Sequence, residues 1–117
     1  MAITKGTGTS VIASTTSTTT SSAIDVSGNY LTEVYCSIVQ VGTATSAATI
    51  QIQVSPDAGT TYYSPPTLLW TAGLSAATYN VTLSVPTSAD KIKVVFTAES
   101  GGTSSTCVVQ LNTVTAV

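Results

Sequence analysis

The chain has 117 residues, of which three are Lys and five are Asp or Glu; it has no His, and its net charge is −2. Three lysines cannot neutralise a run of phosphates, which argues against a nucleic-acid surface and against a polybasic membrane patch. A hydrophobic content of 43% excludes disorder throughout the chain, and this length fits one domain with its own core.

Small hydroxyl side chains dominate the composition. The chain has 24 Thr and 16 Ser, and long helix-forming residues are scarce. Thr and Val favour strands because their branched Cβ suits a pleated surface. The composition therefore predicts an all-β protein. A surface with so few charges also lacks the repulsion that keeps proteins apart, which favours a surface that partners cover.

Residues 1–22 form a Ser/Thr/Gly-rich leader with few large apolar side chains. We expect an N-terminal arm or edge strand here, followed by a β-sandwich domain over residues 23–117. Alone, the leader cannot bury enough apolar surface to offset the entropy of ordering. Three interpretations stay open: a loose tail, an edge strand, or an arm that orders on a neighbouring subunit.

The segment 30–41 is the longest strand candidate, and both of its faces are partly apolar. One face carries Tyr30, Thr32, Val34, Cys36, Ile38 and Gln40, and the other carries Leu31, Glu33, Tyr35, Ser37, Val39 and Val41. Two apolar faces predict a central strand or a strand that is covered on both sides.

Four further segments alternate between apolar and polar residues with the period of a strand. They are residues 47–54, 79–85, 92–98 and 107–113. Residues 55–60 are rich in turn formers, so residues 61–64 are expected to return as the second arm of a hairpin with 47–54. Pro65 and Pro66 then end that strand, because neither can donate to a ladder.

Seven or eight strands joined by short turns, with no helical period, predict an antiparallel two-sheet sandwich. Both immunoglobulin-like and jelly-roll topologies fit, and the sequence alone does not choose between them.

The residues needed for most chemistry are missing, so we expect no enzyme, no cofactor and no metal. Five carboxylates stand apart along the chain, and without His they lack the usual proton-transfer partner. Cys36 and Cys107 are too few for a zinc site or a disulfide framework, and are expected to be small buried residues. No catalytic residue is therefore predicted.

Tyr62, Tyr63 and Trp70 are the candidate contact residues, for a glycan or for a protein. Such rings can form flat platforms for sugars. The alternative, which we favour, is that they pack in the core and on the sheets with their polar tips in water. Alternation places Tyr62 and Tyr63 on opposite faces, so at most one of them joins the core.

Residues Ser55 to Tyr62 resemble the Asp-box pattern, Ser-x-Asp-x-Gly-x-Thr-aromatic, with Tyr in place of the usual Trp. The resemblance implies a β-hairpin whose turn is tied down by Asp57 and by hydroxyl groups. In sialidases the motif lies away from the catalytic site, so it implies no activity.

From about Tyr30 to Val114 the chain resembles the small β-sandwich virion proteins of tailed bacteriophages. The resemblance rests on the Ser/Thr/Ala/Val-rich composition, the Met-Ala start without a visible signal peptide, and the single hairpin motif from Val54 to Tyr62. It implies a capsid decoration (cement) protein that stabilises the shell by subunit contacts, made in the host cytoplasm and located in the virion. The implied partners are the major capsid protein or other virion subunits, and further copies of the chain in a dimer or trimer.

Two other functions remain open at this point. The chain could be a tail, neck or fibre component, which would use the same kind of subunit contact. From another class, it could be a carbohydrate-binding module that uses Tyr62, Tyr63 or Trp70.

Overall fold

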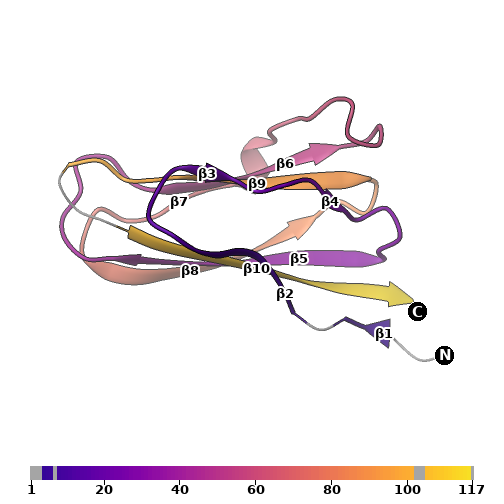
Figure 1. The fold of residues 1–117 in the computed structure, drawn as a ribbon, viewed down its shortest axis with the longest axis horizontal. Helices are drawn as coiled ribbons and strands as arrows, with labels where there is room; N and C mark the ends of the chain where they lie inside the picture. Colours follow the sequence, from indigo (N-terminus) through magenta and orange to yellow (C-terminus); the bar gives the residue numbers. More distant parts are fainter. Residues whose placement is uncertain (1–3, 7, 102–104, 117) are drawn as a thin grey trace.

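The computed structural model in Figure 1 describes residues 4–6, 8–101 and 105–116. Its strands form two antiparallel sheets that pack face to face, which confirms the predicted all-β sandwich. The first sheet contains β1 (Thr4–Lys5), β2 (Thr9–Thr15), β5 (Leu31–Gln40), β8 (Ala77–Val85) and β10 (Ser105–Ala116). The second contains β3 (Thr19–Thr20), β4 (Ile24–Asp25), β6 (Thr49–Ser55), β7 (Leu69–Thr71) and β9 (Lys91–Thr97).

The strand order is that of a jelly roll, one of the two topologies that the sequence left open. In the first sheet β10 lies between β5 and the pair β1 and β2, and β8 is the far edge. In the second sheet β9 lies between β6 and the short strands β3 and β4, and β7 is the far edge. From β2 onward the chain changes sheets at every connection except those from β3 to β4 and from β6 to β7.

The predicted alternation correctly identifies the residues that face the core. Ile50, Ile52, Ile92, Val94 and Phe96 of the second sheet and Val34, Ile38, Cys107 and Val109 of the first are all completely buried. Phe96 lies directly opposite Ile50 in the β6–β9 ladder. Because inward and outward residues alternate along each strand, this register fixes which side chains remain on the outer faces.

The hairpin expected between residues 47–54 and 61–64 is reduced to one bridge, between Val54 and Tyr63. The ladder partners of β6 are instead β9 and β7. Pro65 and Pro66 interrupt the returning segment, so regular pairing resumes only after the 3₁₀ turn Pro66–Leu68. Among the described residues no helix is long and apolar enough to cross a membrane.

The N-terminal segment follows one side of the sandwich and crosses from the first sheet to the second (Figure 1). β2 runs along β10 and buries Ile12 in the core. β3 and β4 then pair with the outer side of β9. The hydroxyl-rich leader therefore lies along this side of both sheets, and two of its strands, β1 and β3, are only two residues long.

Candidate interaction surface

The outward side chains of β5 and β10 form a surface that we call the β5–β10 face. Its members are Leu31, Glu33, Tyr35, Ser37 and Val39 from β5, and Val108, Gln110, Asn112 and Val114 from β10. Register places Val114 beside Leu31, and Gln110 beside Tyr35. On the other side of β5, the next neighbour of Tyr35 is Thr82 of β8.

The β5–β10 face exposes large apolar groups to solvent. Tyr35 is 45% exposed and Val39 is 44% exposed, although both lie on β5, which is paired on both sides. Leu31, Val108 and Val114 add half-buried apolar surface on the same face. Glu33 is its one charged member, so a partner that covered the face would have little charge to desolvate.

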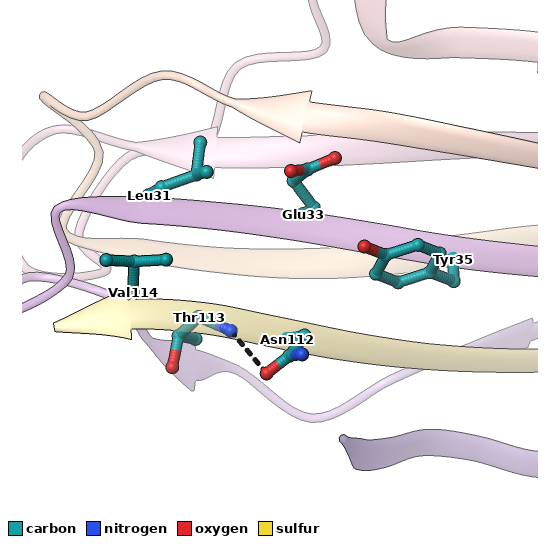
Figure 2. Close-up of a pocket in the computed structure, with 6 residues that line it drawn as sticks. All are labelled: Leu31, Glu33, Tyr35, Asn112, Thr113 and Val114. Carbon is teal, nitrogen blue, oxygen red and sulfur yellow. Dashed lines mark hydrogen bonds between the residues drawn. The ribbon is translucent and has the colours of Figure 1, made fainter. Parts of the chain in front are cut away.

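Figure 2 shows a hollow on this face, with Leu31, Glu33 and Tyr35 along β5 and with Asn112 and Val114 on the neighbouring β10. Its volume is about 60 Å³. The side-chain oxygen Oδ1 of Asn112 accepts a hydrogen bond of 2.9 Å from the backbone N–H of Thr113, which holds the amide along the strand.

A second hollow, of about 210 Å³, lies between Tyr35, Asn80, Val108 and Gln110. Both hollows are smaller than the roughly 300 Å³ at which pockets for small ligands begin. A shallow, weakly charged and partly apolar face of this kind suits contact with another protein surface better than enclosure of a small molecule.

The three aromatic residues singled out from the sequence do not form one platform. Trp70, on β7, is half-buried against the core, and its ring centroid lies 6.5 Å from that of Tyr79. Tyr62 is half-buried beneath Lys93, whose Nζ is 4.4 Å from the ring centroid. Tyr63 is 57% exposed and lies opposite Val54 of β6, with which it forms a single bridge.

Sequence reasoning did not identify Tyr35 and Val39 as contact residues, although the signal was present. The segment 30–41 showed two partly apolar faces, and this pattern predicted a central strand or a strand covered on both sides. The structure places β5 between β10 and β8, with one face on the core and the other exposed. The second apolar face that the sequence pattern showed is therefore the outer face of β5, which no other element of the monomer covers.

The Asp-box residues hold their turn as the motif implies. The Ser55 hydroxyl donates to Asp57 Oδ1 at 2.8 Å, and the backbone N–H of Thr61 donates to the same oxygen at 2.8 Å. These hydrogen bonds hold the pKa of Asp57 below its ordinary value of 3.8, the bond from Thr61 being the larger cause. Gly59 has a φ of +92°, a conformation that glycine adopts without strain.

The two cysteines are buried and free, as expected for small core residues. Burial raises the pKa of the Cys36 thiol to about 12 and that of Cys107 to about 11. Since the thiolate is the reactive form, neither group is a nucleophile at neutral pH. Within the described parts of the chain, no three His, Cys, Asp or Glu side chains gather in a group that could hold a metal ion.

No protein-family model matches the chain, and no curated protein matches its sequence. Among solved structures, the fold is similar to that in the crystal structure of the SPBc2 prophage-derived protein YomS, with a TM-score of 0.45 and 12% sequence identity. The alignment covers 94% of this chain and 96% of that chain. At this degree of similarity the neighbour does not transfer a function, which must be argued from the surface of the chain itself.

Proposed function

We propose that this protein is a structural subunit of a bacteriophage virion, and that it decorates the capsid as a cement protein. The β5–β10 face is the surface that binds the shell. The observation that carries the proposal is the exposure of Tyr35 and Val39 on an inner strand of a sheet that has almost no charge. A monomer that acted alone would gain solubility from polar residues at these positions.

Burial of this face would supply the binding energy. Covering the exposed parts of Tyr35 and Val39 removes apolar surface from water, and contributes on the order of 1 kcal/mol for each side chain. Aromatic residues are also enriched at the centres of protein interfaces. The neighbouring hydroxyl and amide groups of Ser37, Gln110 and Asn112 can exchange hydrogen bonds with a partner without the cost of burying charge.

The stabilising effect on the shell follows from mass action. A subunit that binds the assembled shell, and not its separated proteins, shifts the equilibrium toward the assembled state. The same contact would serve a tail, neck or fibre component. These locations are distinguished by which particle the protein binds, the shell or an isolated tail. The proposed residence is the virion, after synthesis in the host cytoplasm, and the proposed partners are the major capsid protein and further copies of this chain.

The carbohydrate-binding alternative has less support than the subunit contact. Jelly rolls occur in viral capsid domains and also in lectins, so the architecture does not decide between the two. Of the three aromatic candidates, Tyr63 alone is exposed, while Tyr62 and Trp70 are half-buried beside Lys93 and Tyr79. A sugar platform usually needs a broader flat surface than one ring.

The test is co-sedimentation of the purified protein with empty shells of the phage that encodes it, followed by heating of the loaded shells. We expect binding and a higher disruption temperature for wild type, and loss of both for Tyr35→Lys. Tyr63→Lys is the matched control, because it makes the same change at an exposed tyrosine away from the β5–β10 face. Equal binding by the Tyr35 variant, or glycan retention lost only in the Tyr63 variant, would contradict the proposal.

A further inference from the structure

Each of the two sheets has two lateral edges, and three of these four edges are protected. Beyond β10 the first sheet ends in β1, which is two residues long, and in β2, whose pairing with β10 shifts register twice. Beyond β9 the second sheet ends in β3 and β4, which are each two residues long. β7 is only three residues long and follows two prolines, Pro65 and Pro66. Irregular register, shortness and proline are standard ways in which proteins prevent strand edges from pairing with other chains.

The fourth edge, β8, carries none of these protections. β8 has nine residues, pairs with β5 without a shift in register, and has no other ladder partner among the described residues. It contains no charged residue and no proline. Its outward side chains, from Thr78 to Ser84, are short, neutral and exposed. The free side of β8 therefore presents a regular row of backbone donors and acceptors about 30 Å long.

We propose that β8 pairs antiparallel with β8 of a second copy of this chain, about a two-fold axis close to Val81. This register places Asn80 opposite Thr82 of the second copy, with no like charges facing each other. On the inner side it places Tyr79 opposite Leu83 of the second copy. Tyr79, Val81 and Leu83 are only half-buried in the monomer and pack against the core at the open edge, so the pairing buries them further.

A second copy fits this edge better than a strand of another protein, because the edge is complementary to itself. The same uncharged residues meet from both sides, and among the described strands β8 is the one edge strand longer than three residues that pairs without a register shift. Pairing of that kind uses the same patch on both subunits and closes at two copies. A dimer is therefore expected rather than a filament.

The pairing also completes the proposed shell-binding surface. The exposed surface of β10, β5 and β8 in one copy measures about 30 by 14 Å, on the order of 400 Å². One side of a standard protein interface buries about 800 Å². Edge pairing places two β5–β10 faces in one continuous sheet, with the two copies of Tyr35 on strands about 14 Å apart. The dimer itself does not depend on the virion role.

The test uses two charge variants of the edge, Asn80→Lys/Thr82→Lys and Asn80→Glu/Thr82→Glu, in sedimentation equilibrium and light scattering. Wild type should have twice the 11.8 kDa mass of the chain. Each variant alone places like charges opposite each other across the two-fold axis, so its self-association should weaken on the order of tenfold or more. Mixing the two variants should restore a dimer, because Lys then faces Glu.

The control variant is Ser10→Lys/Ser14→Lys, which adds the same charges at exposed positions of β2 and should remain dimeric. Amide hydrogen exchange gives a second measurement: residues 77–85 should lose protection when the wild type is diluted to a monomer. A monomeric wild type, or charge variants whose dimers match the wild type, would overturn the pairing. Tyr35→Lys should stay dimeric but should no longer bind shells. Failure of the virion role and failure of the dimer therefore give different results.

Discussion

At the scale of single residues, one buried polar side chain forms hydrogen bonds with backbone carbonyl groups that belong to two different connections. Gln40 is buried at the end of β5, and its Nε2 donates to the carbonyl oxygens of Gly42, Leu74 and Ser75, at 2.6 Å for Leu74. This side chain therefore ties the β7–β8 connection to the end of β5. This role could not be predicted from the sequence, because Leu74 and Ser75 lie more than thirty positions from Gln40 and accept through their backbone.

Asp57 makes a pH-dependent contribution to the stability of the fold. Its carboxylate accepts the hydrogen bonds that close the Asp-box turn, and its folded pKa lies below the ordinary 3.8. A carboxylate with a lowered pKa stabilises the fold above its unfolded pKa, and this contribution is lost as the pH falls through the folded pKa. We expect acid unfolding monitored by circular dichroism to show this loss below about pH 4.

Asp57→Asn should be less stable than wild type at pH 7, and should show a smaller loss of stability on acidification. Glu33→Gln makes the same change in net charge on the β5–β10 face and serves as the control. If the two variants had the same pH profile, the hydrogen bonds of Asp57 would not be the cause of the dependence.

At the scale of elements, the hydrogen bonds between the leader and β9 explain why the leader is rich in Ser and Thr. Thr18 Oγ1 accepts from the backbone N–H of Ala98, and Ser21 Oγ accepts from the N–H of Val94 at 2.9 Å. Between these two contacts, β3 pairs with Val95 and Phe96 through the backbone. The side chains of serine and threonine thus continue the edge pairing of β9 on both sides of the two-residue strand β3.

Ser21 offers a sharp test of this pairing. Ser21→Ala removes the acceptor of the Val94 N–H, and Val94 is completely buried. An unsatisfied buried N–H costs about 1–3 kcal/mol, so the free energy of unfolding in urea should fall by that amount. Ser22→Ala is the adjacent control, because the Ser22 side chain is exposed and the change should be nearly neutral. Equal effects of the two changes would argue against the edge role.

Period-two alternation was enough to predict β5, β6, β8, β9 and β10, because their apolar residues face one common core. It could not place β3 or β4, which are two residues long and have no period. It also suggested a local hairpin after β6, where Pro65 and Pro66 leave only one bridge. Pairing partners far apart in sequence, such as β2 and β10, leave no local signal.

At the scale of the whole molecule, the leader protects one side of the sandwich and contributes to its core. We expect deletion of residues 1–22 to lower the unfolding temperature and to promote aggregation, because the deletion removes Ile12 from the core and uncovers the edge of β10. Thermal scans with simultaneous light scattering measure both effects. Ile12→Ala in the full chain separates them, since it should cost about 2–5 kcal/mol without exposing an edge. A truncated protein with unchanged melting and no scattering would contradict this expectation.

The pairing of β2 with β10 has a consequence for synthesis. Thr15 meets Cys107 and Thr9 meets Leu111, so β2 finds its ladder partner only in β10. On the ribosome, residues 9–15 must wait until residues 107–111 have emerged. Contacts of such long sequence separation make folding slow, typically milliseconds to seconds for all-β domains. The nascent chain is therefore expected to complete this sheet only after residues 107–111 have left the ribosome, with the hydroxyl-rich residues 9–15 solvated until then.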